Sequence, residues 1–330
     1  MSEVVVVTGA TSGVGRAVAC AFGRQGARVG LLARGEAGLE GARRDVEAAG
    51  GQATAVPTDV ADADQVERAA SRVEEAFGPI DVWVNNAMVT VFAPFKEIQP
   101  DEFRRATEVT YLGTVWGTQA ALRRMRERDR GSIVLVGSAL AYRGIPLQSA
   151  YCGAKHGIKG FFESVRTELL HDHSNIRISM VQLPGLNTPQ FEHCRSKLPK
   201  QPQPVPPIYE PEVAADAVVY AAHHRRRQVY VGAPTVMTIW GNRLLPWVAD
   251  RYLAATGYKS QQTNEDRPAD RQDNLFEPAP GDPGAHGPFD QRAHSSSWLT
   301  WLNLHRAQVG AAAATLAALG GLATAQALRQ

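Results

Sequence analysis

Apolar residues follow two alternating patterns along this chain. Short runs rich in β-branched residues predict buried strands, and stretches with an apolar residue every three or four positions predict helices between them. Because strands and helices alternate, the pattern predicts an α/β fold with a parallel sheet. The expected strands are 4–8, 27–33, 51–60, 80–84, 133–138, 176–183 and 228–232. The expected helices include 36–49, 62–77, 101–128 and 212–222. Two more helices are expected, one directly after the first strand and one that carries Tyr151.

The loop after the first strand is rich in glycine. It reads TGATSGVG from Thr8 to Gly15, and a helical pattern follows at once. Glycines in such a strand-to-helix turn let the backbone approach a pyrophosphate, and the helix N-terminus offers unpaired N–H donors. The position of this loop therefore predicts a dinucleotide site. The expected contacts are Gly9, Thr11, Ser12, Gly13, Val14 and Gly15.

The end of the second strand bears on the choice of cofactor. An acidic residue near this point binds the ribose of NAD, whereas an arginine accommodates the 2′-phosphate of NADP. Ala33 stands where an acid is expected, and Arg34 follows it. We therefore predict NADP(H), the alternative being an ordinary solvated arginine. Asp59 and Val60, after the third strand, are expected beside the adenine, although Asp59 could instead cap the next helix.

Three residues later in the chain suggest proton transfer. Ser138 ends an apolar strand, and Tyr151 and Lys155 are four residues apart in a predicted helix, so they share one face. A nearby lysine cation would lower the pKa of a tyrosine, which could then exchange a proton with an alcohol or carbonyl oxygen while a nicotinamide exchanges a hydride. Ser138 would hold the same oxygen. Spacing alone would also suit a surface pair on an amphipathic helix.

Composition and charge exclude several other classes of function. The 330 residues, of which 44% are hydrophobic, can bury a large core. A formal net charge of +2 gives no support for a nucleic-acid partner. Cys20, Cys152 and Cys194 lie far apart, so neither disulfides nor a zinc site are expected. The start, MSEVVVVTGA, has no secretory signal, and we expect a cytoplasmic protein.

These motifs, in this order, resemble the short-chain dehydrogenase/reductase family over about residues 3–235. The resemblance includes NNA at Asn85–Ala87 and Pro184-Gly185 followed by Thr188. It implies a Rossmann-type doubly wound fold with a seven-stranded parallel sheet, helices on both faces, and a homodimer or homotetramer. By the same resemblance Tyr151 is the general acid/base, Lys155 its modulator and ribose ligand, and Ser138 the residue that orients the substrate oxygen. Asn86, Ala87, Pro184, Gly185 and Thr188 would contact the cofactor.

Two positions depart from the family pattern. Met88 replaces the glycine expected after Asn85-Asn86-Ala87, which could narrow the loop near the nicotinamide. Thr110 stands where the family has a fourth catalytic residue, an asparagine that helps to hold a proton-relay water. A threonine hydroxyl could bind a water, but with a different hydrogen-bond capacity. We therefore expect hydride transfer to be retained and the relay to be altered.

The C-terminal hundred residues are less regular. We expect a catalytic domain over 1–235, a helical segment over 236–256 that covers the pocket or an interface, an irregular arm over 257–297 with little core of its own, and an Ala-rich tail helix over 298–330. Residues 310–328 carry no charge and would reach about 28 Å as a helix, enough for a bilayer core. Their alanine-rich composition also suits a helix that docks on protein or frays.

Together these features predict an oxidoreductase that interconverts a carbonyl and an alcohol on a lipophilic small molecule. Two alternatives remain open at this point. One is a membrane-tethered lipid or sterol-type reductase, suggested by the tail. The other is a slow or inactive cofactor-binding regulatory protein of the same fold, suggested by Met88 and Thr110.

Overall fold

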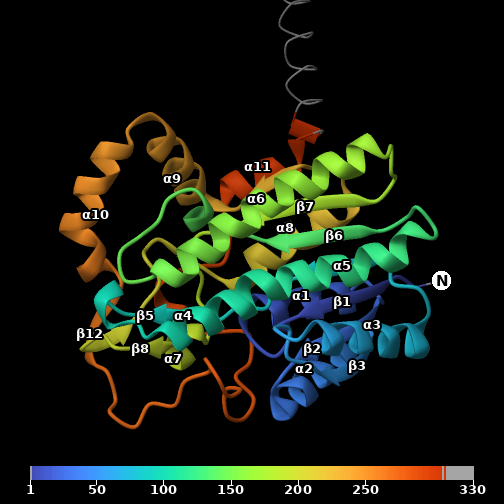
Figure 1. Cartoon of the computed structure of the whole chain (residues 1–330), viewed down its shortest axis with the longest axis horizontal. Helices are drawn as coiled ribbons and strands as arrows, with labels where there is room; N and C mark the ends of the chain where they lie inside the picture. Colours follow the sequence, from blue (N-terminus) through green and yellow to red (C-terminus); the bar gives the residue numbers. More distant parts are fainter. Residues whose placement is uncertain (1, 307, 310–330) are drawn as a thin grey trace, which may run out of the picture.

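A parallel sheet forms the centre of the protein in the computed structural model, which describes residues 2–306, 308 and 309 (Figure 1). The strand order is β11-β7-β6-β4-β1-β2-β3, and all neighbouring strands are parallel. The predicted seven-stranded sheet is thus confirmed. Its strands are β1 (Val4–Thr8), β2 (Arg28–Ala33), β3 (Gln52–Pro57), β4 (Val82–Asn85), β6 (Ser132–Val136), β7 (Arg177–Gln182) and β11 (Gln228–Tyr230).

Helices cover both faces of the sheet because successive side chains of a strand point in opposite directions. In β1, Val5 and Val7 belong to one core cluster, and Val4 and Val6 to the other. The first cluster lies against α1 (Gly13–Gly23), α2 (Glu36–Ala48) and α8 (Pro211–His223). The second lies against α3 (Ala63–Phe77), α4 (Pro100–Thr107), α5 (Gly113–Arg126) and α6 (Ser149–His171).

The helix predicted over 101–128 is not regular. It consists of α4 and α5, joined by a π-helical turn at Glu108–Leu112 that carries Thr110. Pro100 opens α4, and the Glu102 carboxylate accepts a hydrogen bond from the Gln99 N–H at 2.8 Å, which fixes the start of the helix. π-helical turns often occur at functional sites.

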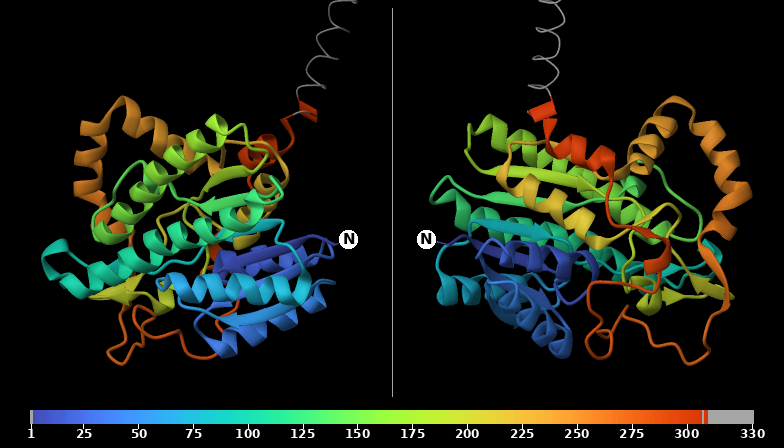
Figure 2. Two further views of the ribbon diagram at one scale, coloured as in Figure 1. Left: turned by 45° about the vertical axis from the view of Figure 1, so that its right-hand side comes forward. Right: turned by 180° about the vertical axis from the view of Figure 1, so that it is seen from behind.

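Three pairs of short strands connect segments outside the main sheet. β5 (Val91–Phe92) pairs with β8 (Arg195–Ser196), β9 (Lys200–Pro202) with β12 (Gln262–Asp266), and β10 (Ile208–Tyr209) with β13 (Ala293–His294). Three further helices are α7 (Gln190–His193), α9 (Gly232–Leu244) and α11 (Trp298–Leu304). Pro246 opens α10 (Pro246–Ser260). Figure 2 shows that α9 and α10 project from one side of the body.

Residues 267–289 form an arm with no helix or sheet strand, and they lie along the body near β2 and α2 (Figure 2). Residues 257–297 are expected to have little core of their own, and two of them pack into the core of the body instead. Leu275 is fully buried in the cluster that includes α3 and α5, and Phe289 is buried against Phe191. The arm is therefore an integral part of the packed protein.

Among residues 2–306, 308 and 309, no helix is both long and apolar enough to cross a bilayer. The tail predicted over 310–328 lies outside the residues that the structure describes.

Replacing Leu275 by alanine should loosen the arm. Removing a buried leucine side chain costs about 2–5 kcal/mol, so the arm should open far more often. Amide hydrogen exchange measured by mass spectrometry should then rise across residues 271–285, while β1 stays protected. The neighbouring Phe276→Ala is the control, because the Phe276 side chain is exposed. Equal exchange in the two variants would contradict a packed arm.

Candidate active site

A cavity of about 900 Å³ lies at the carboxyl ends of the sheet strands. Its lining comes from the loops after β1, β2, β3, β4, β6 and β7, and from α6 and α9. Ligands of doubly wound sheets bind at this edge, where the connections from the two halves of the sheet diverge. Sixteen of the eighteen predicted site residues line the cavity, and the two that do not are Gly15 and Thr110.

The glycine loop packs closely against neighbouring backbone. Gly9 has φ +66°, and a Cβ there would lie 2.7 Å from the Ala87 Cα. Gly15 packs against the Gly9 carbonyl, where a Cβ would come within 2.1 Å, so its part is to bring α1 close to β1. Side chains at either position would collide with backbone. The loop therefore leaves open space beside the start of α1, a region of unpaired N–H groups that suits a phosphate.

Asn86 fastens the end of β4 to the end of β1. Its side-chain amide donates to the Thr8 and Gly9 carbonyls at 3.0 and 3.3 Å, and its N–H donates to the Thr8 hydroxyl at 2.9 Å. Two loops from different βα units are thus held in one geometry. Asn86 and Ala87 line the cavity with the neighbouring Met88, which occupies the place of the family's glycine.

Ser138, Tyr151 and Lys155 come together in the wall of this cavity. Ser138 follows β6, whereas Tyr151 and Lys155 occupy one face of α6. The Lys155 ammonium donates to the Val136 carbonyl at 2.7 Å and lies 5.5 Å from the centre of the Tyr151 ring. The Lys155 side chain, only 3% exposed, is thereby fixed between β6 and the tyrosine.

Burial controls the titration of this pair. It raises the pKa of Tyr151 above its ordinary value, and a polar interaction with the Ser138 hydroxyl offsets part of that rise. Burial also lowers the pKa of Lys155 to about 8. In this structure burial outweighs the lowering of the tyrosine pKa that is expected from the lysine cation. The physical reason is that removing both groups from water disfavours both charged forms.

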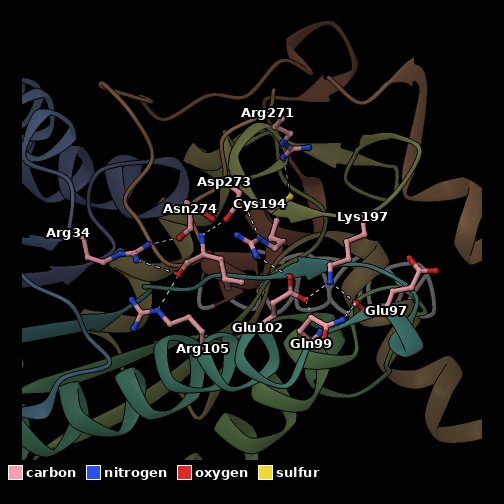
Figure 3. A network of polar contacts seen from close by, with 12 residues as sticks. Arg34, Glu97, Gln99, Glu102, Arg105, Cys194, Lys197, Arg271, Asp273 and Asn274 are labelled. Carbon is pink, nitrogen blue, oxygen red and sulfur yellow. Dashed lines mark hydrogen bonds and ion pairs between the residues drawn. The ribbon is translucent and has the colours of Figure 1, made fainter. Parts of the chain in front are cut away.

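The C-terminal arm contacts Arg34, as Figure 3 shows. The Arg34 guanidinium donates to three successive arm carbonyls, those of Asn274, Leu275 and Phe276, at 2.5, 3.4 and 2.6 Å. Arg105 donates to the same Leu275 carbonyl at 3.2 Å. Arg34 is therefore not the freely solvated strand-end residue of the alternative interpretation. It lines the cavity and holds the arm in place at the same time.

The arm also reaches the glycine loop. Arg16, buried in α1, forms an ion pair with Asp282 at 2.7 Å and a second with Asp45 at 2.8 Å. The Gly13 N–H donates to the Gly284 carbonyl at 3.0 Å. Sequence reasoning missed these contacts. The one available signal was Arg16 itself, a cation within an apolar helix pattern, which needs an acidic partner but does not indicate where in the chain that partner lies.

Asp59 does not cap the helix that follows it. Asp62 does, because its carboxylate accepts hydrogen bonds from the N–H groups of Asp64 and Gln65. Asp59 instead forms an ion pair with Arg105 at 2.5 Å and lines the cavity, together with Val60. The structure thus favours the first of the two interpretations of Asp59, a place beside the site.

Thr110 is fully buried and does not line the cavity. Its hydroxyl donates to the Val89 carbonyl at 3.0 Å and accepts from the Val89 N–H at 3.1 Å. Both bonds hold the loop after β4 against the π-helical turn. The geometry gives no support to the expectation that the Thr110 hydroxyl contacts a relay water, and indicates a positioning residue.

Comparison with known proteins agrees with this site. A model of the short chain dehydrogenase family matches residues 3–199. The chain belongs to the short-chain dehydrogenase/reductase family, as the sequence motifs predict. This membership implies an oxidoreductase with a nicotinamide cofactor.

Three proteins of similar sequence carry different names. The uncharacterized oxidoreductase YxnA of Bacillus subtilis is 33% identical over 261 residues, which cover 78% of this chain and 73% of YxnA. The 3-dehydrosphinganine reductase of Danio rerio is 32% identical over 223 residues, 65% of this chain and 67% of that one. Dehydrogenase/reductase SDR family member 7B of Mus musculus is 36% identical over 188 residues, 56% and 57% of the two chains.

Replacing Lys155 by methionine should stabilise the protein at neutral pH. The pKa of Lys155 is about 8 in the folded protein against an ordinary 10.5, so burying the ammonium costs about 3 kcal/mol of folding free energy. The substitution removes this cost but also loses the hydrogen bond to Val136, which is worth about 1 kcal/mol. Below pH 8 Lys155 is protonated in both the folded and the unfolded chain, so the wild type bears the full cost of burying the charge. Between pH 8 and 10.5 the unfolded chain binds more protons, and wild-type stability rises.

In urea denaturation, the free energy of unfolding of Lys155→Met should therefore exceed that of the wild type by about 2 kcal/mol at pH 7. At pH 10 the difference should have disappeared. Lys159→Met is the matched control, because Lys159 lies one turn further along α6 and pairs with Glu163 at 3.1 Å near the surface. It should show no gain. A loss of stability in Lys155→Met at pH 7 would contradict the inferred cost of burying the lysine charge.

Proposed function

We propose that the protein is an NADP(H)-dependent oxidoreductase that interconverts a carbonyl and an alcohol on a lipophilic small molecule. The observation that carries this proposal is the convergence of Ser138, Tyr151 and Lys155 in the wall of a cavity that extends from the glycine loop into an apolar region. The cradle at Gly9 and Gly13, where side chains would collide or strain the backbone, fits a dinucleotide. When bound, the nicotinamide supplies or accepts the hydride.

The remaining roles fall to side chains. In reduction, the Tyr151 hydroxyl donates its proton to the carbonyl oxygen, and the Ser138 hydroxyl donates a hydrogen bond to the same oxygen. The raised pKa of Tyr151 keeps this proton in place at neutral pH, which suits a general acid. Lys155, charged below about pH 8, stabilises the phenolate that remains after transfer and would bind the ribose of the cofactor.

Charge at the end of β2 supports NADP(H) over NAD(H). Arg34 and Arg105 lie together there, and no acid occupies the position of Ala33. Arg34 uses three of its five N–H groups on the arm carbonyls, so two remain for a 2′-phosphate. Asp59 neutralises Arg105 by its ion pair, so Arg34 is the cation that we assign to cofactor selection.

The rest of the lining supports a lipophilic substrate. Beyond Tyr151 the walls come from three segments, 140–148, 186–207 and 237–253, that contribute mostly apolar side chains. Ile145, Phe191 and Leu253 are among them. A relative bears the name 3-dehydrosphinganine reductase, so keto lipids belong among the compounds to be tested.

One observation favours a second candidate, a cofactor-binding regulatory protein with little turnover. The Gly13 N–H and the Arg34 guanidinium both donate to the arm, and these donors are ones that a dinucleotide would use. A protein in which the arm returns to this position between turnovers would act slowly.

Turnover distinguishes the two candidates. NADPH consumption by the wild type should be detected with ketones or aldehydes that carry long apolar groups. Tyr151→Phe should lower kcat by about a hundredfold or more, because the proton donor is lost while the ring remains. Tyr142→Phe is the control, since the Tyr142 hydroxyl bonds to Gln228 outside this cluster. NADPH binding without turnover in both wild type and mutant would favour the regulatory candidate.

Arg34→Ala tests the choice of cofactor. Loss of a charge-assisted contact with the 2′-phosphate should raise the KM for NADPH by about ten- to a hundredfold and leave that for NADH nearly unchanged. Arg43→Ala is the control, because Arg43 lies on the exposed side of α2 between Glu40 and Glu47. Equal changes for the two cofactors would mean that Arg34 serves only to hold the arm.

A further inference from the structure

Helices α9 and α10 carry an unusual surface. Their outward side chains form what we call the outer face, and they are exposed although large and apolar: Met237, Trp240, Leu244, Leu245, Trp247, Val248, Tyr252 and Tyr258. The inward side chains of the same helices, such as Ala249 and Leu253, line the cavity. Helices that are apolar on both sides are normally buried on both sides. The outer face therefore lacks a cover among the residues that the structure describes.

The mouth of the cavity opens within this outer face. Met237 and Tyr252 both line the cavity, yet they are 72% and 65% exposed. One comes from α9 and the other from α10, so we place the entrance between these two helices. A substrate entering here passes over exposed apolar side chains before it reaches Tyr151.

Charge identifies what covers this surface. Arg243 lies over the Trp240 ring and Arg251 over the Trp247 ring, each with its guanidinium carbon 5.5 Å from the ring centre. Within residues 2–306, 308 and 309, neither arginine nor Lys259 forms an ion pair, whereas the nearby Asp250 is already paired with Arg143. The outer face thus combines apolar side chains, indoles and uncompensated positive charge. That combination suits the interface of a bilayer that contains anionic lipids.

A second copy of the chain fits less well. In a twofold interface the same patch occurs on both subunits, so the positive charges of Arg243, Arg251 and Lys259 would be brought against an equally positive patch. The position of α11 agrees with a bilayer instead. This helix packs on α9, exposes Trp298 and Trp301, and precedes the uncharged residues 310–328 of the sequence.

We propose that the outer face of α9 and α10 docks on an anionic lipid surface, with the cavity mouth directed into the bilayer interface. The inference rests on the proposed function in one respect, since it gives a lipophilic substrate a route from the membrane to Tyr151. It needs no spanning helix. Docking places the entrance at the depth where apolar compounds concentrate, and the indoles of Trp240 and Trp247 lie at the level of the headgroups.

Vesicle flotation of the full chain tests the proposal. The wild type should float with phosphatidylcholine vesicles that contain phosphatidylserine, and less with phosphatidylcholine alone. The double variant Leu244→Asp/Val248→Asp should bind these vesicles at least about tenfold more weakly, because two apolar contacts become carboxylates. Leu170→Asp, at an equally exposed leucine near the end of α6, should bind as the wild type does.

Three results would overturn the proposal. The first is that the wild type does not float. The second is that the double variant floats as well as the wild type, which would mean that residues 310–328 alone suffice. The third is that the double variant differs from the wild type only in the mass measured by sedimentation, which would indicate that a second copy covers the outer face. Turnover of a short, water-soluble carbonyl should be unchanged in the double variant, since neither residue lines the cavity. Turnover without flotation leaves the proposed function intact, whereas flotation without any turnover removes the function and leaves the docking surface.

Discussion

The hydrogen bonds of Asn86 hold the site together. They join the ends of β1 and β4, the two strands from which the chain departs in opposite directions, and so keep the crevice between the two halves of the sheet at a fixed width. The close approach of Gly9 to Ala87 depends on this junction. The loops that present Met88, Ser138 and the start of α1 all extend from this part of the sheet edge. A change in the junction would move several walls of the cavity at once.

Inside that frame, function and stability oppose each other at Lys155. A buried ammonium with a single carbonyl partner lowers the stability of the folded protein, and Lys155 is such a group, 3% exposed and bonded to the Val136 carbonyl. The neighbouring strands supply the compensating hydrophobic burial. The same removal from water that makes the lysine expensive also brings its pKa near the neutral range, where a change of protonation can matter to chemistry.

The sequence predicts the sheet and most of the site because both depend on local patterns. Strand and helix periods come from which residues are buried, and the spacing of Tyr151 and Lys155 places them on one helical face whatever surrounds them. The surroundings of Arg34 could not be predicted in this way. Its partners are backbone carbonyls some 240 residues later, in a segment whose glycine and proline content suggests no structure. Thr110 shows the same limit, since a π-helical turn leaves no clear mark on an apolar repeat.

The pairing of Arg16 with Asp282 has a consequence for where this protein can be divided. Similarity to the family model ends at residue 199, and by that measure everything after it is an appendix. Physically the boundary does not exist, since a chain cut there would keep a buried guanidinium in α1 and lose one of its two carboxylates. During synthesis, the glycine loop leaves the ribosome long before the arm, since 266 positions separate Arg16 from Asp282. The nucleotide end of the cavity is therefore completed only after the arm has been made.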